Sequence, residues 1–421
     1  MPAFRLKYGS THLAVEVPAA NLEGVIEARE QPGLPDPDAA IRAAIAGPVA
    51  GPSLAGIVRP GDRVAVVVSD ITRPAPSHLL VPPVLDALNA VGVPDSHITV
   101  IFALGIHRPH TPAERERLVG AAVTRRVRCI DSDPSDCVRV GVTSRGTIVR
   151  ATRSAVNADV RVCTGNVEYH WFAGYSGGAK ALVPGVCDRA TISANHSLML
   201  QPGAEQGRID GNPLREDIEE AGALIGADFA VNVALNSRRE IVAAFAGRPL
   251  DVLRAGARAI DSMYAIPIER QADVVIASPG GSPKDMNLYQ AQKAIDNARF
   301  AVRPGGALIL AAECREGLGE EVFEQWMDEA REPADLVRRL RAGFVVGGHK
   351  AAALGMAAVH APITLVSAMP PERVRRLFLT PAASLDEALA MAFERLGSGA
   401  SVLVMPNAGS TLPRTRAATP V

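Results

Sequence analysis

One segment of the chain brings together several residue types that can do chemistry. Residues 166–185 read N-V-E-Y-H-W-F-A-G-Y-S-G-G-A-K-A-L-V-P-G, so an imidazole, a hydroxyl and an amine lie among glycines. Glycines permit close approach of the backbone to a ligand, and exposed amides in such a loop can hold a phosphate. The segment is not a P-loop, because Lys180 does not directly follow a glycine and Ala181 replaces the required Ser or Thr. A glycine-rich turn before a helix is the purely structural alternative.

Two histidines lie in a second segment, which reads G-I-H-R-P-H-T over residues 105–111. Pro109 disfavours a helix here, so His107 and His110 are not expected to form a metal pair on one helical face. A loop with one functional histidine is favoured, although a lone loop histidine is more often simply exposed to solvent. Histidine is the usual general base near neutral pH, and that is the chemistry this loop could supply.

A third segment, S-D-I-T-R-P over residues 69–74, contains an arginine that could bind an anion. Arg73 can clamp a carboxylate or a phosphate through two parallel hydrogen bonds. Asp70 or Thr72 could instead cap a helix, with Pro74 in its first turn. The two interpretations are compatible with each other.

A fourth segment, N-L-Y-Q-A-Q-K over residues 287–293, has the spacing of a helix. Tyr289 or Gln290 then shares one helical face with Lys293 at the opening turn. A solvated helix face is the simpler interpretation. The preceding Pro-Gly-Gly at residues 279–281 ends an expected strand, and this position favours a role in ligand binding.

These segments must be positioned by a scaffold, and the apolar runs before them predict one. Buried parallel strands are expected at residues 63–69, 98–103, 160–164, 272–278 and 307–312. Helices expected at about residues 79–91 and 288–299 complete two βαβ units, and hairpins are expected at residues 4–17 and 230–246. Open parallel sheets bind ligands beyond the carboxyl ends of their strands, where the polar segments lie.

The length of the chain predicts more than one domain. A chain of 421 residues exceeds what one hydrophobic core usually serves. We therefore expect an α/β fold with two domains, each with a mostly parallel sheet flanked by helices, and an active site in the interdomain cleft. The expected N-terminal domain is 1–268, which carries the lysine and the histidines, and the expected C-terminal domain is 269–421.

Composition excludes several classes of protein. The formal net charge is -1 and no long run of Lys or Arg occurs, so nucleic acid is not expected as a partner. The five cysteines form no C-x-x-C pair, which is typical of a reduced, cytoplasmic protein. No stretch of 18 apolar residues occurs, and the first ten residues lack the apolar run of a signal peptide, so no membrane association is expected.

Taken together and in their order along the chain, the four segments resemble the lactate racemase family and its hydroxy-acid racemase and epimerase relatives. The resemblance covers about residues 70–297. It implies a nickel-pincer nucleotide, a pyridinium-3-thioamide-5-thiocarboxylate mononucleotide with Ni, covalently attached to Lys180. The remaining nickel ligand corresponds to His196, and a single imidazole suffices when the pincer supplies the other donors.

The resemblance also implies the reaction and the residue roles. His107 and His170 correspond to the two catalytic histidines, each of which takes the hydroxyl proton of one enantiomer of a small aliphatic 2-hydroxy acid while hydride moves from C2 to the cofactor ring. Arg73 and Lys293 are then expected to hold the substrate carboxylate. The other implied substrate contacts are Tyr289 and Trp171, and the other implied cofactor contacts are Asp70, Thr72, Ser176, Gly177, Gly178 and Gln290.

The expected partners are the small-molecule substrate, the cofactor-synthesis proteins transiently, and a second copy of the chain in a possible homodimer. Trp171 and Tyr175 depart from the phenylalanine expected of relatives, so an epimerase or racemase of a larger polar 2-hydroxy acid, a sugar acid or a dicarboxylic acid, is an alternative. A zinc-dependent hydrolase that uses both loop histidines and His170 is another, but it leaves Lys180 unexplained. A non-catalytic nucleotide-binding or cofactor-carrier protein is the third, and it would not require two histidines.

Overall fold

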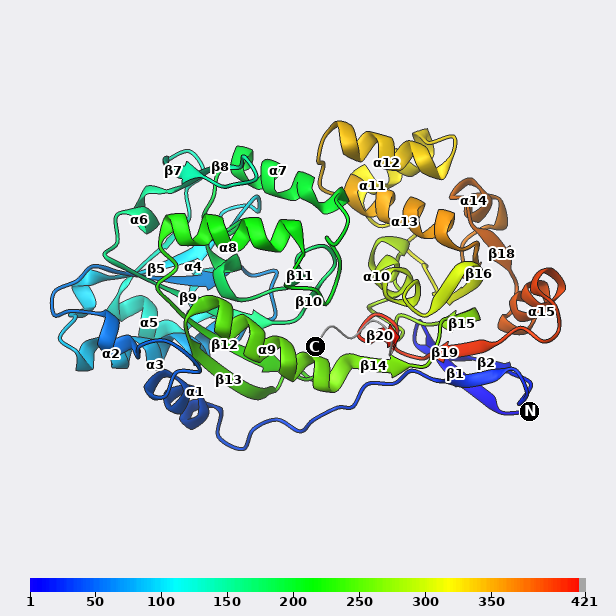
Figure 1. Cartoon of the computed structure of the whole chain (residues 1–421), viewed down its shortest axis with the longest axis horizontal. Coiled ribbons are helices and arrows are strands. Elements are labelled where there is room, and N and C mark those ends of the chain that lie inside the picture. The colour runs from blue at the N-terminus through cyan, green and yellow to red at the C-terminus, as the bar shows by residue number, and fades with distance from the viewer. Residues whose placement is uncertain (416–421) are drawn as a thin grey trace. The chain divides into compact units, whose positions relative to one another are not determined.

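The computed structural model describes residues 1–415 and contains two compact units. The central unit comprises residues 30–262, and the terminal unit comprises residues 1–29 together with the chain from residue 263 onward. Both are α/β units with a six-stranded sheet, and Figure 1 shows strands and helices in each. The expected fold class, two units with mostly parallel sheets flanked by helices, is confirmed.

The sheet of the central unit has the strand order β13-β12-β9-β4-β5-β6. All neighbours are parallel except β12 and β13, which form the expected hairpin. Its inner strands are apolar and β-branched, as strands covered on both faces require. The strands are β4 (Val64–Ser69), β5 (Ile98–Ala103), β6 (Arg128–Asp131), β9 (Val160–Val167), β12 (Phe229–Leu235) and β13 (Ile241–Gly247).

Helices and short hairpins surround this sheet. The helices are α1 (Pro37–Ala46), α2 (Leu54–Ile57), α3 (Ser77–Ala90), α4 (Pro112–Val119), α5 (Ala121–Arg126), α6 (Arg153–Val156), α7 (Arg189–Ser197), α8 (Pro213–Ile225) and α9 (Pro249–Tyr264). Short 3-10 turns are η1 (Asp95–His97), η2 (Gly178–Ala181) and η3 (Leu198–Leu200). Two small hairpins pair β7 (Cys137–Val142) with β8 (Ile148–Thr152) and β10 (Tyr169–His170) with β11 (Gly174–Tyr175).

The sheet of the terminal unit has the strand order β18-β17-β16-β15-β19-β3 and is parallel throughout. Its strands are β3 (Leu22–Val25), β15 (Ala272–Ala277), β16 (Val302–Ala311), β17 (Ile363–Val366), β18 (Thr380–Ala382) and β19 (Val402–Met405). Its helices are α10 (Leu288–Ala298), α11 (Glu321–Glu329), α12 (Pro333–Ala342), α13 (Gly348–His360), α14 (Pro371–Arg376) and α15 (Leu385–Leu396). The pair β1 (Ala3–Tyr8) and β2 (Thr11–Glu16) is antiparallel, and the pair β14 (Ala265–Ile268) and β20 (Leu412–Thr415) is parallel.

The division of the chain differs from the expected one at its amino end. Residues 1–29 belong with the C-terminal part of the chain and not with the N-terminal domain expected at 1–268. The reason is packing: β3 pairs with β19, and Leu6 and Val15 of the first hairpin join the hydrophobic core beneath β15. Among residues 1–415, no helix is long and apolar enough to cross a membrane.

Candidate active site

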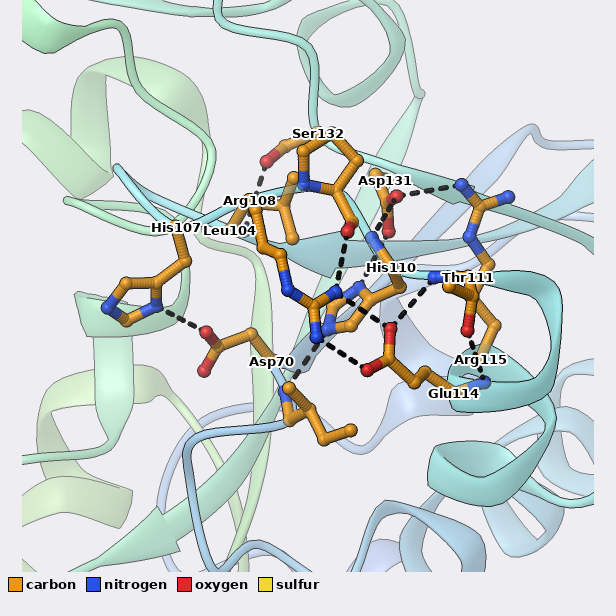
Figure 2. A network of polar contacts seen from close by, with 12 residues as sticks. Asp70, Leu104, His107, Arg108, His110, Thr111, Glu114, Arg115, Asp131 and Ser132 are labelled. Carbon is orange, nitrogen blue, oxygen red and sulfur yellow. Dashed lines mark hydrogen bonds and ion pairs between the residues drawn. The ribbon is translucent and has the colours of Figure 1, made fainter.

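Two loops meet at the carboxyl end of the central sheet. Strands β4 and β5 are parallel neighbours with Ser69 opposite Ala103, so the loops that follow them leave the sheet side by side. Nδ1 of His107 is hydrogen-bonded to the carboxylate of Asp70, which is 3% exposed, whereas the imidazole is 41% exposed (Figure 2). Thr72 donates its hydroxyl to the other oxygen of that carboxylate at 2.8 Å. Asp70 therefore fixes the orientation of an accessible imidazole.

The environment of Asp70 keeps it ionised. Burial by itself would raise the pKa of Asp70, but hydrogen bonds from His107 and Thr72 and the positive charge of Arg73 outweigh it, and the net pKa is lowered. A carboxylate that accepts from Nδ1 leaves Nε2 as the imidazole nitrogen that can take a proton. The helix-capping alternative for this segment is wrong, because α3 begins only at Ser77.

His110 is buried and points away from this accessible imidazole. Its Nδ1 lies 2.8 Å from Oδ1 of Asp131, and its Nε2 accepts from the backbone N–H of Ile71 at 3.2 Å (Figure 2). Because Nε2 acts as an acceptor, Nδ1 is the nitrogen that donates to Asp131. Asp131 also pairs with Arg115 at 2.7 Å. His110 therefore connects two loops.

The glycine-rich loop, residues 168–181, is tied to the end of β9. Ser176 donates its hydroxyl to the carbonyl of Asn166 at 2.8 Å and accepts from the N–H of Glu168 at 3.0 Å. Its hydroxyl thus organises the loop. Gly174 has φ +74°, and a Cβ there would meet the carbonyl oxygen of Arg208 at 1.9 Å, so only glycine fits.

Gly177 and Gly178 form the turn that leads into η2 and Lys180. Both have positive φ, and a Cβ on Gly177 would come within 2.9 Å of the side-chain oxygen of Asn232. That oxygen accepts from the N–H of Gly178 at 2.8 Å. The absence of side chains at Gly177 and Gly178 lets the backbone of this turn approach neighbouring groups closely.

Three aromatic rings link this loop to α7. His170 packs edge-on against Phe172 with ring centroids 4.6 Å apart, and Phe172 packs edge-on against His196 at 5.1 Å. Trp171 also contacts Phe172, at 5.5 Å. Helix α7, which carries His196, is bonded to α8, because the neighbouring Asn195 donates to the buried carboxylate of Asp217 at 2.8 Å.

The loops share one electrostatic environment. Burial lowers the pKa of Lys180 well below its usual range, and the positive charges of Arg73 and Arg215 lower it further. Burial likewise lowers the pKa of His170 well below its usual range, helped by the charges of Lys180 and Arg73. The charge of His196 also lowers the pKa of His170. The structure thus brings together the amine, the imidazoles and the arginine that the sequence singled out in this unit.

The fourth segment lies in the terminal unit, on the first two turns of α10. Asn287 caps the helix by accepting from the N–H of Gln290 at 3.0 Å. Tyr289 is half-buried, and Lys350 of α13 lies 4.0 Å from its ring centroid and donates to its carbonyl at 2.7 Å. Gln290 and Lys293 are exposed.

Two residues of the site are not identifiable from the motifs. No sequence motif around Asp131 marks it as a residue of the site. Arg215 lies four residues before Glu219, which is the spacing of an ordinary exposed ion pair, yet its side chain is fully buried. A signal was present in the helical spacing, because Arg215 shares a face with the buried Ile218 and Gly222.

The donor set suits a cofactor that brings most of its own metal ligands. Within residues 1–415, no group of three or more His, Cys, Asp or Glu side chains could hold a metal ion. The zinc hydrolase alternative required such a group, and His110 is engaged with Asp131 instead. The buried imidazole of His196, the amine of Lys180 and the turn at Gly177 and Gly178 fit a covalently attached metal cofactor.

Comparison with known proteins agrees with this arrangement. The family model for the lactate racemase N-terminal domain matches residues 8–207, and that for the lactate racemase C-terminal domain matches residues 268–412. The lactate racemase of Thermoanaerobacterium thermosaccharolyticum is 28% identical and aligns over 99% of this chain and all of its own length. The lactate racemase of Lactiplantibacillus plantarum is 30% identical over 86% of this chain and 87% of its own length.

Solved structures agree as well. The lactate racemase apoprotein of T. thermosaccharolyticum superposes with a TM-score of 0.87 over 98% of this chain and 100% of that chain, at 28% identity. A protein from Thermotoga maritima shares the fold, with a TM-score of 0.62 over 92% of this chain and 100% of that chain, at 18% identity. The chain therefore belongs to the lactate racemase family of isomerases.

Proposed function

We propose that this chain interconverts the enantiomers of a small aliphatic 2-hydroxy acid such as lactate. The observation that carries the proposal is that two imidazoles lie on separate loops of the central unit, His107 bonded to Asp70 and His170 under the influence of the charge of Lys180. Inversion of a stereocentre needs an acid and a base on opposite sides of the substrate, which two loops can supply and one helix cannot. Both curated relatives reported above are lactate racemases, which supports the choice of substrate.

We assign the proton transfers to the two histidines. Asp70 occupies Nδ1 of His107, so Nε2 of that ring takes the proton from the substrate hydroxyl. Nδ1 of His170 accepts from the N–H of Ala173 at 3.3 Å, so the neutral ring carries its proton on Nε2 in this arrangement. To act as the base at Nε2, the ring must carry its proton on Nδ1 instead and release the bond from Ala173. Burial favours the neutral form of His170, and a neutral imidazole is the form that can act as a base.

Substrate binding is assigned by charge. Arg73 is exposed at the end of β4 next to the Asp70 and His107 pair, where a guanidinium can hold a carboxylate. On α10 of the terminal unit, Lys293 is assigned to the same carboxylate, Tyr289 to the substrate and Gln290 to the cofactor. Trp171 is assigned to the substrate side chain, whose size it would limit.

The cofactor assignment rests on Lys180 and His196. Lys180 would carry the covalent attachment, His196 would supply the protein ligand to nickel, and the turn at Gly177 and Gly178 would receive the nucleotide. When bound, the nickel-pincer nucleotide supplies a ring that accepts a hydride from C2 and returns it. Asp70 and Thr72 orient His107 and thereby complete the pocket on the opposite loop.

The test is production of the chain with and without the cofactor-synthesis enzymes, followed by intact mass, metal analysis and racemisation of both lactate enantiomers. Activity should appear only with the covalent adduct and about one equivalent of nickel, and Lys180→Ala should lose both. Full activity in adduct-free protein after simple addition of nickel or zinc salts would sink the proposal. A panel of 2-hydroxy acids distinguishes lactate from larger polar acids.

A further inference from the structure

Arg215, near the start of α8, is a fully buried arginine whose bonds all lead to the glycine-rich loop or to its own helix. Its Nε donates to the carbonyl of Ala173 at 3.0 Å, and one terminal nitrogen donates to the carbonyl of Tyr175. The other terminal nitrogen pairs with Glu219 at 3.0 Å. Figure 1 shows β10 and β11 of this loop beside α8. A buried guanidinium costs free energy, so its bonds to two carbonyls of the same loop indicate a specific task.

Helix α8 also packs directly against the turn that carries Lys180. A Cβ placed on Gly222 would lie 2.6 Å from the Cβ of Ala179, the residue before Lys180. The absence of a side chain at Gly222 thus permits the close approach of α8 to η2. The charge of Arg215 and the amine of Lys180 are held in fixed relation by this contact.

We propose that Arg215 is a positioning residue for Lys180: it fixes the loop from Ala173 to Tyr175 and places a buried positive charge on the helix packed against the turn that carries Lys180, and both prepare the amine to react with the cofactor. This inference rests on the proposed covalent attachment at Lys180. It adds a residue that takes no part in the motifs and touches neither substrate nor cofactor in the proposed function.

The physical reason is the low dielectric around the loop. An ordinary lysine is unprotonated at neutral pH in only about one molecule in a few thousand. Burial lowers the pKa of Lys180, and the charges of Arg73 and Arg215 add to this, against the opposing carboxylates of Glu168 and Asp70. The charge of Arg73 is exposed and screened by solvent and salt, whereas that of Arg215 is not.

Glu219 offsets part of the charge of Arg215. Burial raises the pKa of Glu219, and Arg215 opposes this rise. Removal of the negative charge of Glu219 should therefore act on Lys180 in the direction opposite to removal of the positive charge of Arg215. This pair of opposite effects separates an electrostatic role from simple anchoring of the loop.

The experiment measures the reactivity of Lys180 in the cofactor-free full-length chain. The probe is an amine-reactive aryl fluoride: the lysine nitrogen forms a bond to the ring carbon, fluoride leaves, and the amine proton passes to the buffer. The labelling rate of the peptide that contains Lys180 is followed by mass spectrometry across pH, with Lys180→Ala as the background. Because the assay needs no cofactor, its outcome does not depend on whether the proposed function is right. The proposed function is tested separately, by looking for the covalent adduct in protein produced together with the cofactor-synthesis enzymes.

The expected results are ordered by charge. Arg215→Gln should raise the apparent pKa of Lys180 and slow labelling about tenfold at a pH below the pKa of the wild-type amine. Arg215→Lys keeps the charge and should stay close to the wild-type profile. Glu219→Gln should move the profile to lower pH.

A matched control is Arg161→Met. Arg161 is also largely buried and donates to the carbonyls of Ala158 and Gly226, both at 2.6 Å, but it lies at the opposite end of β9 from the loop. Its loss should leave the labelling profile unchanged. An unchanged profile in Arg215→Gln, or an equal rise in Arg161→Met, overturns the proposal. If Arg215→Gln does not fold, Glu219→Gln decides: a shift to lower pH supports the proposal, and no shift overturns it.

Discussion

His110 accepts a hydrogen bond at Nε2 from the backbone N–H of Ile71, 3.2 Å away, and so joins the loop after β5 to the loop after β4. The second nitrogen of the ring is bonded to Asp131 at the end of β6. Three neighbouring strands are thereby connected at the edge where Asp70 and His107 meet (Figure 2). The two histidines of one short motif have separate tasks, since one is accessible and the other holds the loops in place.

This relationship predicts that His110→Ala destabilises the fold without removing nickel. The variant loses both hydrogen bonds of a buried ring and leaves a cavity, so the free energy of unfolding should fall by about 2–4 kcal/mol in urea titrations. His78→Ala, an exposed position on α3, is the control and should change it by less than about 0.5 kcal/mol. Loss of the bound nickel in folded His110→Ala would contradict the structural role.

The fold elements that the sequence predicted are those whose signal is local. The strands at β4, β5 and β15 and the hairpin of β12 and β13 were readable because apolar β-branched runs end in glycine or polar residues. The pairing of β3 with β19 was not readable, because no local pattern specifies a partner that lies nearly 400 residues away. That pairing decides to which unit the first 29 residues belong.

The site was predictable to the same extent. Histidines, glycines and a lysine in short motifs reveal themselves by type, and the central unit does gather those of three motifs. Arg215 could not be identified by residue type, because an arginine four residues before a glutamate on a helix usually indicates a solvated ion pair. Only the tertiary contact of α8 with the loop buries this side chain. Ser176 had the residue type of a phosphate ligand, but its hydroxyl is bonded within the loop.

Replacement of Asp70 should impair catalysis more than binding. In Asp70→Asn the side chain no longer holds the imidazole of His107 through an ionised acceptor, so proton transfer at Nε2 loses its orientation. We expect kcat to fall at least about tenfold in both directions, with KM changed less. The covalent adduct and nickel content should remain, and a kcat within about twofold of the wild type would remove Asp70 from this role.

Arg73→Ala should show the opposite pattern. A charge-assisted bond to the substrate carboxylate contributes about 1.5–3 kcal/mol, so KM should rise about tenfold or more. Lys293→Ala should behave in the same way. Arg108→Ala is the control, because this exposed arginine lies on the neighbouring loop and pairs with Glu114. An unchanged KM in both Arg73→Ala and Lys293→Ala would exclude them from carboxylate binding.

Asp296 on α10 should make stability depend on pH. Burial raises its pKa from 3.8 to about 6, against the charges of Arg299, Lys350 and Lys293. The folded state then binds this proton more tightly than the unfolded state, so the group costs no stability below about pH 4 and becomes unfavourable as pH rises to about 6. As pH rises from about 4 to about 6, the free energy of unfolding of Asp296→Asn should increase by about 3 kcal/mol relative to that of the wild type in urea titrations. A constant difference across pH 4–7 would show that the carboxyl is not perturbed.

The two histidines give the sharpest prediction, because it tests the mechanism and not only the family. If His107 and His170 act as acid and base by turns, replacement of either by Ala should stop interconversion in both directions, since the same groups serve the forward and the reverse reaction. Under the proposed hydride mechanism, deuterium at C2 of lactate should be retained in the inverted product, because the hydrogen would leave C2 as hydride and return without entering water. A carbanion route would exchange it with solvent. The measurement is NMR of product formed in ordinary water, with His97→Ala, a surface histidine bonded to the carbonyl of Gly61, as the control that keeps full activity. Rapid washout of deuterium, or racemisation at the wild-type rate by His170→Ala, would show that the assignment is wrong.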